Sequence, residues 1–183
     1  MSTMSEYLGR PVEERLTRMA RTPSDIDAAI KGYNDEVLSR RPDQHNWSGK
    51  EVICHLRDIE EVFVLRFYMM LGTDDPMFLV LGEFPPDRER WGLRPEDDMP
   101  LNPMRWAEER QYLKNDATLA LQSFTRRRTE LLTFLKRLSP EQLMRGSLHV
   151  TLGPMTFHDW LAVIAAHDDT HLAQLQRALD ARP

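Results

Sequence analysis

The sequence is poor in cysteine and in long apolar runs. Cys54 is the one cysteine among 183 residues, so no disulfide can form within the chain. No apolar run approaches the roughly 18 to 20 residues that a transmembrane helix needs. The first residues, MSTMSEYLGRPVEERL, are rich in acids and lack the apolar middle of a signal peptide. These absences predict a cytoplasmic protein with no membrane span.

The chain also has no excess of positive charge. Its formal net charge of −5 argues against a nucleic-acid-binding surface and against a basic helix lying on a membrane. The one basic cluster is the run Arg126-Arg127-Arg128, which Glu130 follows, and we interpret it as an exposed helix face. With nucleic acids and membrane surfaces disfavoured, we expect the partner to be a small-molecule substrate.

The remaining composition is that of a globular protein. Apolar residues make up 41% of the chain and charged residues 29%, far from a disordered composition. A chain of 183 residues is long enough to bury a core. We therefore expect residues 1–183 to form one domain, with a helical core at about 23–180.

Helix-start signals divide this core. Each begins at a Ser, Thr or Asn that can cap a helix, followed by a proline or an acid: Thr22, Ser48, Asn102, Ser139 and Thr156. The signals predict four long helices and a short turn after Ser139, and the third helix can break near Asn115 and Asp116. The expected helices are 23–40, 48–71, 103–138 and 156–180.

Little strand signal remains between the helices. The stretch SLHVTL, residues 147–152, alternates over too short a span to found a sheet, and Gly153-Pro154 ends it. Four amphipathic helices in one domain predict an all-α fold, a four-helix bundle. The segment 72–102 between the second and third helices is unusually long, which is typical of lids and crossovers. We expect it to be a crossover that also walls a pocket.

Near the C-terminus the chain reads AAHDDTHLAQLQ, with His167 and His171 four residues apart. On a helix these two lie about 40° apart on one face, together with Trp160 and Ile164, so they fall on the seam that the bundle buries. Buried histidines need hydrogen-bond partners or a metal. A core pair satisfied by its neighbours is one interpretation, and a metal site is the other. A zinc-protease motif is disfavoured, because Asp168 stands where that motif has glutamate.

A third ligand is available on the second predicted helix. His55 lies in register with Val52 and Ile59 on the buried face, and bundle cores often take metal ligands from facing helices. Three imidazoles with one open position are typical of a catalytic metal site. The other histidines fit less well: His158 is about 180° from His167 on the helix, and we expect His45 and His149 to be exposed.

Four other residues invite a role in the chemistry. Asp168 follows His167 directly, but it lies about 100° off the seam and we expect it to be solvated. Glu51 is explained by its capping box with Ser48. Arg66 could anchor a substrate carboxylate, although a buried ion pair is the simpler interpretation. Cys54 is expected to be a small core residue rather than a reactive thiol.

Three stretches together resemble one known family: NWSGKEVICHLRD from Asn46 to Asp58, GPMTFHDW from Gly153 to Trp160, and HDDTHLAQ from His167 to Gln174. In that order they resemble the DinB/YfiT-like family of damage-inducible, metal-dependent bundle proteins, which is unrelated to the polymerase of the same name. The resemblance spans residues 23–180.

The resemblance implies a four-helix bundle with a long crossover between its second and third helices, often forming a homodimer. It implies one divalent metal ion, usually zinc or nickel, held by three histidines. By position these are His55, His167 and His171, the same three that the buried seam selects.

The resemblance also bears on the reaction. Members of the family include mycothiol-dependent isomerases and transferases and bacillithiol transferases, so the first expectation is transfer of a low-molecular-weight thiol to a small electrophile. Metal-dependent hydrolysis is the second expectation, and a binding protein without turnover is the third. Nothing in the residues identifies the metal, since three imidazoles suit several divalent ions.

Overall fold

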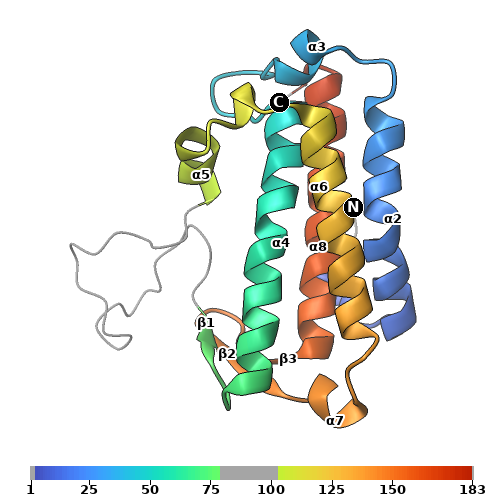
Figure 1. The fold of residues 1–183 in the computed structure, drawn as a ribbon, viewed down its shortest axis with the longest axis vertical. Coiled ribbons are helices and arrows are strands. Elements are labelled where there is room, and N and C mark those ends of the chain that lie inside the picture. The colour runs from blue at the N-terminus through green and yellow to red at the C-terminus, as the bar shows by residue number, and fades with distance from the viewer. Residues whose placement is uncertain (1–2, 79–102, 183) are drawn as a thin grey trace, which may run out of the picture.

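Four long helices carry most of the computed structural model, which describes residues 3–78 and 103–182. They run side by side as a bundle (Figure 1), which confirms the predicted fold class. The predicted crossover falls largely on residues 79–102. These lie outside the described residues, as does the pocket wall expected there. The helices are α2 (Val12–Ile30), α4 (Gly49–Gly72), α6 (Ala117–Leu135) and α8 (Phe157–Leu179).

Helices α4 and α8 begin where the sequence predicts. The side chain of Ser48 accepts from the backbone N–H of Glu51, whose carboxylate accepts in return from the Ser48 N–H. Thr156 and Asp159 make the same reciprocal pair at the start of α8. Each box satisfies donors that a helix start leaves open, and so both helices that carry histidines have a fixed first turn.

The sequence predicts a helix that starts after a cap at Thr22. Helix α2 instead begins ten residues before Thr22, at Val12, and has Pro23 inside it. A proline removes the hydrogen bond to the carbonyl four residues before it, which here is the carbonyl of Met19. That carbonyl instead accepts from Nη1 of Arg128 at 2.9 Å. A side chain from another helix thus replaces the missing bond, and the helix continues through the proline.

The predicted helices 23–40 and 103–138 are each divided. The first ends at Ile30, and a separate helix α3 (Asp35–Ser39) follows, capped by Asn34. The second consists of α5 (Pro103–Glu109), the 3₁₀ turn η2 (Tyr112–Lys114) and α6, and the break near Asn115 and Asp116 is confirmed. Two more short helices are α1 (Met4–Leu8) and α7 (Pro140–Leu143), the latter capped by Ser139 as predicted.

A small sheet forms at one end of the bundle, where no sheet is predicted. Its strands are β1 (Met77–Phe78), β2 (Gly146–His149) and β3 (Gly153–Thr156), in the order β1-β2-β3. Strand β1 is parallel to β2, and β2 is antiparallel to β3. The short alternating stretch has strand partners on both sides, one of them distant in sequence, and no local pattern could reveal that.

The sheet is attached to the bundle through Trp160 of α8. The indole N–H of this buried residue donates to the Ser147 hydroxyl at 3.0 Å. His149, predicted to be exposed, packs against the same indole at 5.7 Å between ring centroids and is 7% exposed. Its Nδ1 accepts from the backbone of Leu152 at 3.1 Å, and burial lowers its pKa to about 4. This histidine therefore has a structural role.

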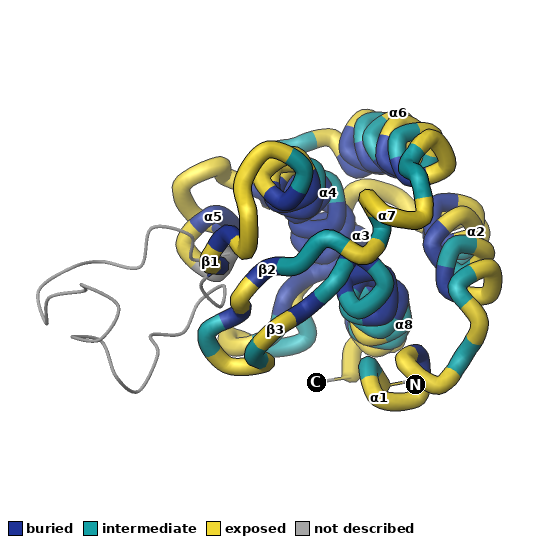
Figure 2. Tube along the Cα trace, turned by 90° about the horizontal axis from the view of Figure 1, so that it is seen from below, coloured by how far each residue is buried: buried dark blue, intermediate teal, exposed yellow. Residues whose placement is uncertain are grey.

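The core lies between the four helices, whose buried surfaces face inward in Figure 2. Helix α4 packs against both α6 and α8. Trp160 and Cys54 belong to this core, as predicted, and burial raises the pKa of the Cys54 thiol to about 11.

The part of the chain that the structure describes holds no helix with the length and apolar character of a membrane span.

Candidate metal centre

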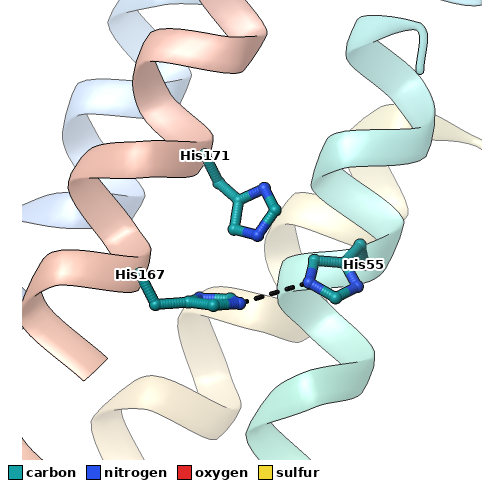
Figure 3. Close-up of side chains that lie close together, drawn as sticks. All are labelled: His55, His167 and His171. Carbon is teal, nitrogen blue, oxygen red and sulfur yellow. Dashed lines mark hydrogen bonds between the residues drawn. The ribbon is translucent and has the colours of Figure 1, made fainter. Parts of the chain in front are cut away.

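Three histidines from two helices meet at one point between α4 and α8. Each of His55, His167 and His171 offers a ring nitrogen, and these nitrogens lie within 4.8 Å of one another. The Nε2 atoms of His55 and His167 are 3.2 Å apart (Figure 3). The ring centroid of His171 lies 4.6 Å from that of His55 and 4.2 Å from that of His167. The structure thus brings together the three residues that the sequence selects.

The three histidines differ in how far they are buried. His55 is 3% exposed, whereas His167 and His171 are half-buried. Two aromatic rings flank the three imidazoles. Trp47 lies in the loop before α4. Its ring centroid is 5.0 Å from that of His55, and its ring stacks on that of His171 with 6.4 Å between centroids. Phe63 meets His167 edge-on at 5.9 Å. The three imidazoles are thus packed against aromatic rings as well as against one another.

Electrostatics keep these imidazoles neutral. Burial, followed by the neighbouring imidazoles, holds the pKa of His55 and of His167 well below the ordinary value. Burial also lowers the pKa of His171, although the hydrogen bond with Gln174 opposes it. Neutral imidazole is the form that binds metals, so the site presents donors in the right protonation state.

Hydrogen bonding within the protein does not account for the buried pair. In the part of the chain that the structure describes, Nδ1 of His55 and Nδ1 of His167 are buried without a hydrogen-bond partner. A core pair satisfied by its neighbours would have such partners. Of the two histidines on α8, His171 does have a partner, Gln174. The observation therefore counts against the simpler interpretation for His167, whose Nδ1 has none among the described residues.

The donor set fits a divalent ion. A tetrahedral zinc ion with bonds of about 2.0–2.1 Å to two imidazoles places their nitrogens about 3.3 Å apart, and the Nε2 atoms of His55 and His167 are separated by 3.2 Å. Three imidazole ligands leave the fourth position of a tetrahedral ion to water or substrate, which is the pattern of catalytic metal sites. The residues could therefore hold one metal ion.

Other candidate residues point elsewhere. Glu51 is bound by its capping box and by Arg41. Asp58 accepts from Arg57 and from the hydroxyl of Tyr112. The guanidinium of Arg66 is buried and lies 4.9 Å from the ring of Trp160. His45 is exposed, as expected, and none of these residues joins the histidines.

A buried ion cluster beside the histidines is the main feature that the sequence analysis misses. Asp168, predicted to be solvated, is 0% exposed, and Arg128, predicted on an exposed face, is 1% exposed. Arg128 binds both Asp168 and Glu60. The available signal is that Arg128 continues an apolar row on α6 at helical spacing, the other members being Leu121, Phe124, Leu131 and Leu135.

The cluster joins all four long helices. Arg128 of α6 donates to Glu60 of α4 at 3.0 Å from Nε, and to Asp168 of α8 at 3.0 Å from Nη2. The hydroxyl of Thr22 in α2 donates to Asp168 at 2.6 Å. Because Asp168 follows His167 directly, this network fixes α8 at the position where α8 presents its first histidine.

Replacing Glu60 with glutamine should change how stability depends on pH. Glu60 is fully buried, and burial raises its pKa despite the opposing charge of Arg128. A raised pKa in the folded state contributes stability below the unfolded-state value, and this stability is lost as the pH rises through the folded-state value. Glutamine is neutral throughout. The free energy of unfolding of Glu60→Gln, relative to that of the wild type, should therefore increase as the pH rises from 4.5 to 8.

The measurement is urea unfolding at several pH values. Glu61→Gln, which removes a carboxylate that is 51% exposed, serves as the control for the loss of one charge. If Glu60→Gln and Glu61→Gln give parallel curves of unfolding free energy against pH, then burial does not raise the pKa of Glu60 in the folded protein.

Known proteins resemble this chain over most of its length. Residues 18–175 match the model of the DinB superfamily. A protein of Oceanobacillus iheyensis, named as a candidate metal-dependent hydrolase, is 21% identical over 168 residues, which are 92% of this chain and 85% of the relative. The solved structure of YfiT from Bacillus subtilis matches this chain with a TM-score of 0.71 and 19% sequence identity, and the match covers 91% of this chain and 85% of the YfiT chain.

YfiT is described as a probable metal-dependent hydrolase with an unusual four-helix bundle topology. At this identity, the likeness to YfiT establishes the shared fold.

Proposed function

The chain belongs to the DinB superfamily, and from this membership and the three converging histidines we propose that it is a metal-dependent enzyme. In this proposal His55, His167 and His171 hold one divalent ion. The observation that carries the proposal is the convergence of three ring nitrogens from two helices on one point. Zinc and nickel are the ions we propose, because the family resemblance implies them and both accept imidazole ligands.

When bound at such a site, a divalent ion supplies Lewis acidity, which lowers the pKa of a water or thiol and polarises a carbonyl. The chain's own residues prepare the site. His55 comes from the capped helix α4, and the two others come from α8, which the Arg128 cluster holds in place. Trp47 and Phe63 cover two sides of the imidazoles and limit the access of water.

We propose hydrolysis of a small molecule as the leading reaction, because the names of both relatives point to it. Thiol transfer, the reaction expected first from the sequence resemblance, is the second candidate, since an open position at the ion can equally accept a thiolate. The chain would not supply that thiol itself. Cys54 is fully buried, and its sulfur faces the carbonyl of Tyr112 at 3.9 Å. A low-molecular-weight thiol would be the co-substrate.

The test of the metal site is elemental analysis of untagged protein. We expect about one zinc or nickel ion per chain in the wild type, and none in His55→Ala or in the double variant His167→Ala/His171→Ala. A His45→Ala variant is the matched control, because His45 is exposed and lies outside the cluster. Circular dichroism should show unchanged helix content in all of them.

A wild type that takes up neither zinc nor nickel after incubation would remove the metal and both enzyme proposals with it. Turnover separates the two reactions. A hydrolase converts activated esters or amides without added thiol, whereas a transferase consumes thiol and electrophile together. Metal binding with neither activity would support the third expectation, a binding protein.

We further propose that the protein acts in the cytoplasm as a homodimer of single-domain chains, on a small-molecule substrate and without binding nucleic acid. The acidic net charge of −5 supports the last part. The dimer rests on the family resemblance, and sedimentation of the purified chain tests it.

A further inference from the structure

Among the three histidines, His171 has a hydrogen bond that the other two do not have. Its Nδ1 lies 2.7 Å from Oε1 of Gln174. The two residues are three positions apart on α8, and so their side chains lie on the same face of the helix. In the described part of the chain, Nδ1 of His55 and Nδ1 of His167 are buried without a partner. The three imidazoles are therefore not equivalent.

This contact selects one tautomer of the ring. A carboxamide oxygen can only accept a hydrogen bond, so the Nδ1 of a neutral His171 must carry the proton. The other nitrogen, Nε2, then keeps its lone pair. In Figure 3 one ring nitrogen of His171 points toward the rings of His55 and His167. Since Nδ1 faces Gln174, that nitrogen is Nε2.

We propose that Gln174 is a positioning residue: it fixes the tautomer and the ring orientation of His171, and thereby presents Nε2 to the metal. The inference rests on the proposed metal site. Partners of this kind on the far side of a ligating histidine raise metal affinity by about 10- to 100-fold. His55 and His167 are oriented instead by packing against Trp47 and Phe63.

Two substitutions separate the hydrogen bond from the size of the side chain. Gln174→Met keeps the length and removes the acceptor, whereas Gln174→Glu keeps an acceptor oxygen. Gln176→Met, at an exposed position of the same helix, is the control for a glutamine-to-methionine change on α8. Thermal melts of the metal-free proteins check that each variant is folded.

Two readouts are needed. Nitrogen-15 NMR of the metal-free proteins at pH 8 reports the His171 tautomer: we expect the proton on Nδ1 in the wild type and in Gln174→Glu, and a mixture in Gln174→Met. Titration with Zn²⁺ should show about 10- to 100-fold weaker binding for Gln174→Met. Gln174→Glu should bind within a few-fold of the wild type or tighter, and Gln176→Met should bind as the wild type does.

A proton on Nε2 of His171 in the wild type, or unchanged Zn²⁺ affinity in Gln174→Met, would overturn the assignment of Gln174. Failure of the proposed metal site gives a different result. The wild type then binds no Zn²⁺, although the His171 tautomers of the wild type and of Gln174→Met still differ as expected. In that case Gln174 orients His171 but positions no ligand, and the inference falls together with the proposed function.

Discussion

Replacing Arg128 with methionine should lower the free energy of unfolding by about 3–5 kcal/mol. Arg128 is the cation facing two fully buried carboxylates, those of Glu60 and Asp168. Without it, these two charges lose their partner in a medium that cannot solvate them. The Met19 carbonyl also loses the donor that replaces the bond missing at Pro23. For a chain of this length the melting temperature should fall by about 6–20 °C.

Thermal and urea unfolding measure the effect, with Arg126→Met as the control. Arg126 is an exposed neighbour on the same helix, and its substitution should change stability by no more than about 0.5 kcal/mol. A triple variant that replaces Arg128, Glu60 and Asp168 with apolar residues should recover much of the loss, because no charge is then left unpaired. Equal stability of Arg128→Met and Arg126→Met would mean that the buried cluster contributes nothing.

Removing the metal should lower the melting temperature of the wild type. An ion that binds only the folded state, present at 100 times its dissociation constant, stabilises that state by about 2.7 kcal/mol. For a chain of this length that corresponds to about 5–11 °C. Chelation with EDTA should produce this shift, and excess zinc should reverse it.

Differential scanning calorimetry with and without chelator tests the prediction. His55→Ala should melt at one temperature in both conditions, because it lacks one of the three proposed ligands, whereas His45→Ala should respond as the wild type does. An EDTA shift of the same size in His55→Ala would locate the stabilising ion somewhere other than between α4 and α8.

The parts of the fold that the sequence predicts well are those with local signals. Ser48 and Thr156 begin α4 and α8 through contacts within four residues, and periodicity then places His55 and His167 on buried faces. Helices α4 and α8 pack against each other. Correct prediction of the buried face of each helix was therefore enough to bring the histidines together. The three-histidine cluster therefore follows from short-range information and one assumption about packing.

The errors concern residues whose environment is set by distant partners. Thr22-Pro23 has the local form of a helix start, but Arg128, more than a hundred positions away, completes the helix around Pro23. Asp168 looks solvent-facing on its own helix, yet Thr22 and Arg128 bury it from two others. Residues 147–152 are too short to suggest a sheet until β1 supplies the third strand. The apolar row on α6 marks Arg128 as inward-facing, but propensity and periodicity do not identify the distant partners in such contacts.

The separation of the histidines along the chain has a consequence for biosynthesis. His55 and His167 are 112 positions apart, so the donor set does not exist in a growing chain that has emerged only as far as α4. The binding point is created when α8, near the C-terminal end, docks against α4. Binding of the proposed ion must therefore follow synthesis of the chain through α8, and the ion would close a loop of over a hundred residues. Closing so long a loop is entropically costly for an unfolded chain, which favours loading after folding rather than before it.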